Sequence, residues 1–242
     1  SGARAASLAA NAGLQFAAPR PLTADGYEET FQVNWLGHAV LIELLGPHLA
    51  AGAPIVVTAS GTHDPANRLA RVFGFRGGLF AGVEKVARGQ LDPAASPAQQ
   101  AKDFYATSKL CTLLHAHALA RRLPVGAGRV IAFDPGLMPG TGLARDRNAL
   151  GQWAWSAVLP VVVGPLPGTS TAQRSGAALA DLLLGRALAE ETGRHVDFRL
   201  LPATSSADSL RQEWQHELDA FALAVTSTVA TTGERHRLLP TP

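Results

Sequence analysis

Short, uninterrupted apolar runs alternate along the chain with longer segments whose apolar residues recur every three or four positions. The clearest runs are residues 54–60 and 129–136, with a third at 195–201 and a weaker one at 5–13. Apolar runs of this length are typical of strands that are buried on both faces of a parallel sheet. Their alternation with helical segments predicts an α/β protein with a Rossmann-like, doubly wound parallel sheet of four strands.

Capping residues mark the predicted helices. Asp25, three residues before Glu28, predicts a helix start, and the Gly-Pro step at 46–47 predicts its end. Ser96 followed by Pro97 predicts the start of a second, long helix. Two further helices are expected over residues 170–193 and about 208–230.

Residues 1–242 read as a single domain that carries two irregular regions. Residues 61–95 are rich in glycine, arginine and alanine and fit neither period, so they are interpreted as an insertion, a long loop that is functional or disordered. Residues 141–168 are interpreted as a substrate lid. The aromatic residues of both regions indicate a fairly large, apolar substrate, and they are Phe73, Phe75, Phe80, Trp153 and Trp155.

Composition narrows the function classes. The 21 lysines and arginines are scattered and nearly matched by 19 acidic residues, so nucleic acid is not expected as a partner. A single cysteine, Cys111, excludes an internal disulfide framework and favours a reducing, cytoplasmic location. The longest apolar stretch, 153–165, is too short for stable membrane insertion. Self-association into a homo-oligomer stays open.

Tyr105 and Lys109 lie one helical turn apart and therefore on the same side of the second helix. A cation at that distance is expected to lower the phenol pKa from its ordinary value of about 10, which would make Tyr105 a general acid or base. The spacing alone also fits a lysine that extends its ammonium group to solvent beside a half-buried tyrosine.

Other polar residues stand where strands are expected to end. Ser60 closes an apolar strand, and Asn34 lies on the inner stripe of the first helix. The segment 11–13 closes another strand with Asn-Ala-Gly, and residues 134–143, "DPGLMPGTGL", follow a third. Open α/β sheets bind ligands at the carboxyl ends of their strands, so these residues are expected to meet in one cleft.

Taken in order, these motifs resemble the short-chain dehydrogenase/reductase family. The resemblance covers roughly residues 5–200 and includes "VNWLGH" and Tyr-x-x-x-Lys. Within the family, "DGYEETFQVNWLGH", "YATSKLC" and "PGLMPGTGLAR" look most like the light-dependent protochlorophyllide reductase and retinol-dehydrogenase-like branch. The resemblance implies an NAD(P)-dependent oxidoreductase that transfers a hydride to or from a carbonyl/alcohol pair or an activated double bond, with NADP slightly favoured over NAD.

The resemblance also implies residue roles. Tyr105 would be the proton donor or acceptor, Lys109 would lower its pKa and bond the nicotinamide ribose, Ser60 would hold the substrate oxygen, and Asn34 would anchor a relay water. The implied catalytic set is Asn34, Ser60, Tyr105 and Lys109. The implied cofactor-binding set is Asn11, Ala12, Gly13, Tyr105, Lys109, Pro135, Gly136, Leu137 and Thr141.

Members of the family begin with a strand and a glycine-rich turn of the Gly-x-x-x-Gly-x-Gly kind, and no such turn opens this chain. The sequence is therefore interpreted as the C-terminal part of a short-chain dehydrogenase fold whose N-terminal βαβ part is missing, and the isolated chain is expected to bind a dinucleotide poorly. The alternative interpretation is a non-catalytic module of the same fold that binds a ligand or partner.

The remaining candidates are weaker. No metal site is predicted, because His115 and His117 are two residues apart on a helix and face different sides. His63 reads as an exposed loop histidine, although it could reach a substrate. Asp64 and Asp92 read as solvated loop residues, and Cys111 as a small buried helix residue.

Overall fold

A computed structural model of the protein describes residues 2–138 and 167–237, with side chains up to residue 231. Four parallel strands form one sheet in the order β1 (Leu8–Ala10), β2 (Ala53–Thr58), β3 (Gly128–Asp134) and β4 (Arg194–Asp197). The predicted parallel α/β, Rossmann-like fold is confirmed. Because all four strands are parallel, their carboxyl ends lie at the same edge of the sheet. The sequence analysis placed the candidate site residues at this edge.

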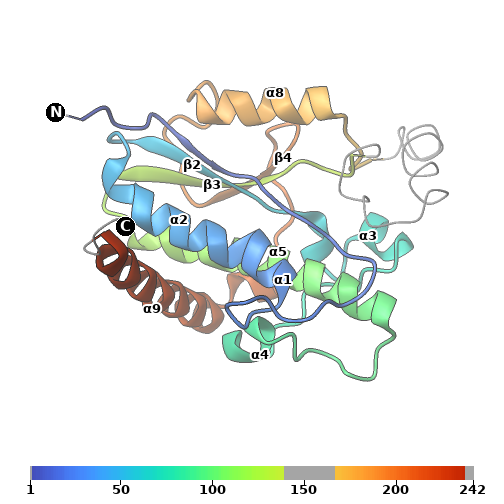
Figure 1. Ribbon diagram of the computed structural model, residues 1–242. Coiled ribbons are helices and arrows are strands. Elements are labelled where there is room, and N and C mark those ends of the chain that lie inside the picture. Colours follow the sequence, from blue (N-terminus) through green and yellow to red (C-terminus); the bar gives the residue numbers. More distant parts are fainter. Residues whose placement is uncertain (1, 139–166, 238–242) are drawn as a thin grey trace.

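Helices cover both faces of the sheet (Figure 1). One face carries α8 (Ala172–Leu183), and the other carries α2 (Gly37–Leu45) and α5 (Pro97–Arg122), on which α9 (Gln212–Arg237) packs from outside. Successive side chains of β2 point to opposite faces of the sheet. Val56 therefore packs with α8, while Ile55 and Val57 pack with α2 and α5. Although α5 and α9 each have 26 residues, no helix in the described ranges is long and apolar enough to cross a membrane.

The first helical segment begins later than predicted. Glu28, not Asp25, is the N-cap of α1 (Glu29–Phe31), and its carboxylate accepts the backbone N–H groups of Thr30 at 3.0 Å and Phe31 at 2.6 Å. A π-helical turn, Gln32–Leu36, joins α1 to α2, and a 3₁₀ turn, Gly46–His48, follows α2 at the predicted Gly-Pro step.

Two other helix boundaries also differ from the prediction. Helix α8 ends at Leu183 rather than near Gly193, because Gly185 takes a left-handed conformation with φ +67°. Helix α9 starts at Gln212, after a separate 3₁₀ turn at Ala207–Leu210.

Residues 61–95 are not one continuous loop as predicted, because short helical segments interrupt them. They contain a 3₁₀ turn, Gly61–His63, and the helices α3 (Arg68–Val72) and α4 (Val83–Ala87). Gly78 lets this segment approach α5, since a Cβ there would lie 2.6 Å from the Cβ of Leu110. The backbone of this segment therefore lies directly against α5, at a distance that leaves no room for a side chain at position 78.

A buried carboxylate also attaches the insertion to α5. Asp103 is 1% exposed and accepts two hydrogen bonds from Arg76, at 3.0 and 2.6 Å, and one from Gln99 at 2.9 Å. Arg76 also pairs with Asp92 at 2.7 Å, and the Asp92 side chain remains 34% exposed, as predicted for a solvated loop residue. Asp64 is instead buried, and it accepts the backbone N–H of Ala66 at 2.8 Å.

Candidate active site

Tyr105, Lys109 and Ser60 meet at the carboxyl edge of the sheet, as predicted. The Tyr105 hydroxyl shares a hydrogen bond with the Ser60 side chain. The Lys109 Nζ lies 5.8 Å from the Tyr105 ring centroid and donates to the carbonyl of Thr58, the last residue of β2, at 2.8 Å. Tyr105 is 7% exposed and Lys109 3% exposed. The tyrosine and lysine therefore share one face of α5, against the end of β2.

The expected lowering of the Tyr105 pKa is not found. Burial raises the pKa of Tyr105 to about 12, and this outweighs the opposing effect of the hydrogen bond from Ser60. Burial lowers the pKa of Lys109 to about 8. The phenol is therefore protonated at neutral pH, beside an ammonium group that is still mostly charged. This state suits donation of a proton rather than its removal.

Asn34 is buried beside this pair, but its amide is already engaged. Its Oδ1 accepts the backbone N–H of Leu14 at 2.8 Å, while its Nδ2 donates to the Leu14 carbonyl at 2.9 Å and to the Ser108 hydroxyl at 3.0 Å. Both amide hydrogens are thus used, so the proposed relay water has no amide donor left here. Asn34 instead fixes residues 13–14 against α5.

The predicted cofactor-lining segment 11–13 follows β1 and lies beside the end of β2. The Asn11 side chain accepts a 2.7 Å hydrogen bond from the Thr58 hydroxyl, and Asn11 and Ala12 are exposed. A Cβ at Gly13 would lie 3.5 Å from the Asn34 Oδ1 and 3.8 Å from the Lys109 Nζ. The structure therefore brings the segment next to the lysine, as expected.

The other predicted cofactor-binding segment follows β3. Several of its backbone groups already form hydrogen bonds within the protein, which the sequence did not predict. The Pro135 carbonyl accepts from the Ser175 hydroxyl at 2.7 Å. Leu137 donates its N–H to Gly168 and accepts from the N–H of Ser170, both at 2.9 Å. Gly136 has φ +73° and packs on Phe198. Of the implied residues, Thr141 lies outside the described ranges.

Sequence reading missed one glycine pattern in this segment. Gly136, Gly140 and Gly142 do have the Gly-x-x-x-Gly-x-Gly spacing, after β3 rather than at the start of the chain. The described part of it, residues 136–138, carries an isolated bridge between Leu137 and Thr169 and no helix N-terminus. The other two glycines of the pattern lie outside the described ranges.

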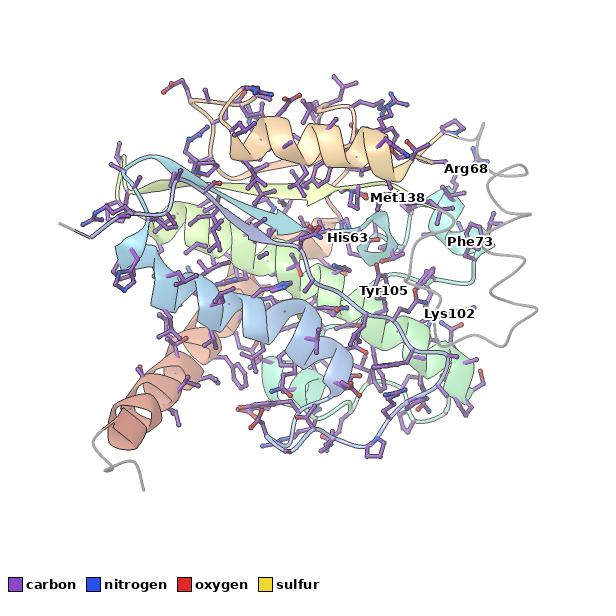
Figure 2. The ribbon with its side chains drawn as sticks, turned by 45° about the horizontal axis from the view of Figure 1, so that its top comes forward. His63, Arg68, Phe73, Lys102, Tyr105 and Met138 are labelled. Atoms are coloured by element: carbon purple, nitrogen blue, oxygen red, sulfur yellow. The ribbon has the colours of Figure 1, made fainter. Side chains whose placement is uncertain are left out.

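Two residues at this edge of the sheet were missed or misjudged. His63 is 1% exposed, not an exposed loop residue, and its ring joins two distant segments. Its Nε2 accepts the N–H of Ser206 at 3.2 Å, so the proton is on Nδ1, which donates to the Ser60 carbonyl at 2.7 Å. Asp134, the last residue of β3, lies close enough to raise the pKa of both Tyr105 and Lys109. Figure 2 shows His63, Tyr105 and Met138 on the side where β2 and β3 end.

The aromatic residues of the insertion separate into two groups. Phe75 faces the site, with its ring 5.9 Å from that of Tyr105. Phe80 packs against Trp214 of α9 at 4.9 Å and so belongs to the core. Phe73 caps α3 on the same side of the molecule as Tyr105 (Figure 2). The predicted lid residues Trp153 and Trp155 lie outside the described ranges.

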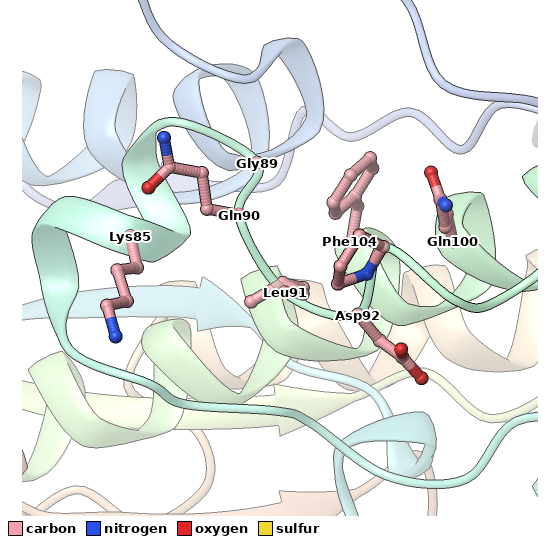
Figure 3. Close-up of a pocket in the computed structure, with 8 residues that line it drawn as sticks. Lys85, Gly89, Gln90, Leu91, Asp92, Gln100 and Phe104 are labelled. Atoms are coloured by element: carbon pink, nitrogen blue, oxygen red, sulfur yellow. The ribbon is translucent and has the colours of Figure 1, made fainter.

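Two cavities of the described structure lie away from this chemistry. One of about 470 Å³ is formed between α4 and the start of α5, with Lys85, Leu91 and Phe104 in its wall (Figure 3). Another of about 420 Å³ is lined by His117 and His195 beside β4. Neither contains Tyr105, Lys109 or Ser60, so we assign the site from the side-chain chemistry rather than from cavity size.

An acidic cluster on the helical face is explained without a metal ion. Glu43, His115 and Asp219 lie close together, with their candidate ligand atoms within 4.8 Å of one another. Arg122 already pairs with both carboxylates, at 3.0 Å to Asp219 and in direct contact with Glu43. The positive charge that the cluster needs is therefore supplied by the arginine. Cys111 is fully buried, as expected of a small helix residue, and burial raises its pKa.

The chain is similar to known oxidoreductases over part of its length. It is 35% identical over 125 residues to the human WW domain-containing oxidoreductase, a match that covers 51% of this chain and 27% of the relative. The chain thus matches about a quarter of that protein's length. No family model matches the chain.

Solved structures share the fold. An uncharacterised protein from Mycobacterium paratuberculosis is 25% identical, with a TM-score of 0.56 over 93% of this chain and 68% of the other. A blue fluorescent protein from a metagenomic library, solved with NADPH, is 23% identical with a TM-score of 0.51 over 79% and 62%. A short-chain dehydrogenase/reductase of unknown function from Caenorhabditis elegans, solved with cofactor, is 17% identical with a TM-score of 0.51 over 80% and 64%. The chain is thus similar over part of its length to a known oxidoreductase and has the fold of solved short-chain dehydrogenases/reductases.

Proposed function

We propose that this chain carries the proton-transfer machinery of an NAD(P)-dependent oxidoreductase that acts on a carbonyl/alcohol pair or an activated double bond. The observation that carries the proposal is the hydrogen bond between the Tyr105 and Ser60 hydroxyls, with the Lys109 ammonium beside the ring. A hydroxyl pair of this kind gives a substrate oxygen two hydrogen-bond donors at one point.

The cofactor is proposed to be NADP or NAD, with NADP slightly favoured by the family resemblance. Two observations fit a dinucleotide at this edge of the sheet. Residues 11–13 are largely exposed beside the Lys109 ammonium, and the backbone at Gly13 has no side chain between it and Lys109. Solved structures of the same fold contain NADPH or an unspecified cofactor. When bound, the reduced cofactor supplies the hydride.

The side chains have distinct roles in the reduction direction. The Tyr105 hydroxyl donates its proton to the substrate oxygen, and the Ser60 hydroxyl hydrogen-bonds the same oxygen and holds it in place. The Lys109 ammonium stabilises the phenolate that remains on Tyr105, and Asn34 fixes residues 13–14 that line the cofactor. The reverse reaction would need Tyr105 deprotonated, which its raised pKa disfavours at neutral pH.

The substrate is proposed to be fairly bulky and apolar. Phe75 presents its ring beside Tyr105, and Phe73 lies on the same side of the molecule. Within the family, "YATSKLC" and "PGLMPGTGLAR" support a place in the protochlorophyllide reductase and retinol-dehydrogenase-like branch.

Replacement of Tyr105 by phenylalanine tests the proposal. In the protein expressed from its complete reading frame, we expect Tyr105→Phe to lower the turnover of bulky ketones by about 10²- to 10⁴-fold, the usual contribution of a positioned general acid. Dinucleotide affinity, measured by calorimetry with NADPH and NADH, should stay within about twofold, because the hydroxyl does not anchor the cofactor.

Tyr27 is the matched control, as the chain has two tyrosines and Tyr27 packs against Phe31 and Phe221 away from the site. Tyr27→Phe should leave turnover unchanged. If Tyr105→Phe turned over at the wild-type rate, some other group would be the proton donor.

The second candidate function is a non-catalytic module that binds a ligand or partner through the same fold. It is favoured only by the occupied backbone groups of Pro135 and Leu137, which leave fewer contacts for a nicotinamide ring. Absence of turnover with either dinucleotide across apolar and polar carbonyl compounds, together with intact folding, would favour it.

A further inference from the structure

Asp134 occupies the end of β3, between two loops that border the active site. Its Oδ1 accepts the N–H of Gly136 at 2.9 Å, and its carboxylate also accepts the N–H of Gly61. A Cβ at Gly61 would lie 3.3 Å from the Asp134 Oδ2, so the contact with that loop is close. One carboxylate therefore joins the loop after β2, which carries Ser60, to the loop after β3, which carries Pro135 and Gly136.

The charge of this carboxylate is placed among the proton-transfer groups. The titratable or charged groups that face it are His63 of the 61–63 turn, Tyr105 and Lys109 of α5, and Asp197 of β4, with His38 of α2 beyond Lys109. His63 is neutral, as its bonds to Ser60 and Ser206 require. Lys109 is thus the cation among these groups at neutral pH, and the Asp134 carboxyl group, whose own pKa burial raises, faces it across the end of the sheet.

We propose that Asp134 is a positioning residue of this active site, which fixes the Ser60 loop against the Pro135–Gly136 loop and places its carboxyl group beside Lys109 and Tyr105. A negative charge stabilises a nearby ammonium and disfavours a nearby phenolate, so both effects have the same electrostatic origin. This proposal rests on the proposed function for its catalytic meaning. Its structural content, the interaction of Asp134 with Lys109, can be measured without substrate or cofactor.

Titration of Lys109 measures its interaction with Asp134 directly. The chain has three lysines, Lys85, Lys102 and Lys109, and the pKa of Lys109 is lowered by burial to about 8. In protein labelled with ¹³C at the lysine ε-carbon, the Lys109 signal should titrate near pH 8 in a range where the protein stays folded. Asp134→Asn keeps the size and one acceptor oxygen but removes the charge. It should lower the Lys109 pKa by about 0.5 unit or more, as removal of a nearby opposite charge predicts.

Asp197→Asn is the matched control. Asp197 is paired in register with Asp134 at the end of the neighbouring strand, but its carboxylate is bonded to Arg199 at 2.6 and 2.8 Å. This variant should leave the Lys109 titration in place. Should Asp134→Asn fail to fold by circular dichroism, Asp134→Ser, whose hydroxyl can still accept the Gly136 N–H, replaces it.

The outcomes separate this proposal from the proposed function. A lower Lys109 pKa in the Asp134 variant, and not in the Asp197 variant, supports the role of Asp134. An unchanged or raised Lys109 pKa overturns it, whatever the activity. Full activity of Tyr105→Phe would instead overturn the catalytic proposal and leave the Asp134–Lys109 interaction standing. If both proposals hold, kcat of Asp134→Asn should fall more steeply than wild type as pH rises from 7 to 9, because Lys109 loses its proton earlier.

Discussion

Buried histidines should make the fold sensitive to mild acid. His115 is 2% exposed and His195 is 7% exposed, and the Nε2 atom of each has no hydrogen-bond partner among the described residues. Burial lowers the pKa of His115 to about 4 and that of His195 to about 3. In the unfolded chain both titrate near 6.5. The native state therefore excludes protons that the unfolded chain accepts.

The sign and size of the effect follow from that difference. Above pH 6.5 both histidines are neutral in both states, and their contribution to stability is fully present. As the pH falls below 6.5 the unfolded chain binds protons first, so stability is lost until the native pKa values are reached. Between pH 7.5 and 5.5 each histidine should cost about 1.4 kcal/mol, and the two together about 3 kcal/mol. The raised pKa values of Glu28 and Asp134 act in the opposite direction, because there the native state binds protons more readily than the unfolded chain.

Urea unfolding at pH 7.5, 6.5 and 5.5 measures this loss. His115→Gln should reduce the loss of unfolding free energy between pH 7.5 and 5.5 by about 1.4 kcal/mol, because it removes one of the buried histidines. Packing alone can also change the stability of the variant at pH 7.5, so the change with pH is compared rather than the absolute value. His216 on α9 is exposed, and His216→Gln should leave the loss unchanged. A wild-type unfolding free energy that stayed constant from pH 7.5 to 5.5 would refute the reasoning, as would a loss that His115→Gln does not alter.

Two packing predictions use matched pairs within the chain. Gly78→Ala should destabilise the fold by about 1–3 kcal/mol, since its Cβ would lie 2.6 Å from a leucine of α5, whereas Gly176→Ala, with open space in α8, should stabilise it by about 0.5–1 kcal/mol. Thermal unfolding compares the two, and equal effects would contradict the assigned contact. Arg76→Met should cost about 1–3 kcal/mol by leaving the Asp103 carboxylate buried without its cation. Arg186→Met, which removes an exposed pair, should change the unfolding free energy by less than about 0.5 kcal/mol, and a similar loss in both would mean that burial does not govern these pairs.

The sheet and the Tyr105–Lys109–Ser60 group could be predicted from the sequence because their signals are local. An apolar run identifies a buried strand, and a spacing of four residues fixes a common helix face. Ser96 likewise caps α5 as predicted, accepting the N–H of Gln99 at 3.3 Å. The start of the first helix was predicted wrongly because two nearby acidic residues, Asp25 and Glu28, could each cap it. The structure uses Glu28, and the local sequence alone does not distinguish the two.

Features that depend on distant partners were not predictable in the same way. His63 is buried because Ser206, 143 residues later in the chain, supplies a donor to its ring. The expected fall in the Tyr105 pKa assumed that charge would dominate, whereas desolvation depends on how completely α5 is covered. The role of Asp134 depends on the meeting of two loops from different strands.

The π-helical turn at Gln32–Leu36 sets a limit on how this protein can be altered or can diverge. A π-helical turn holds one residue more than an α-helical turn, and it places Asn34 toward Leu14 and Ser108. Deleting one residue there would restore a regular α-helix and rotate the preceding residues by about 100° relative to α2. Side-chain substitutions in this segment change one contact at a time, but a change of length would turn Phe31 out of the core and Asn34 out of the site together. Chain length at this turn is therefore under stronger constraint than the identity of any exposed residue in it.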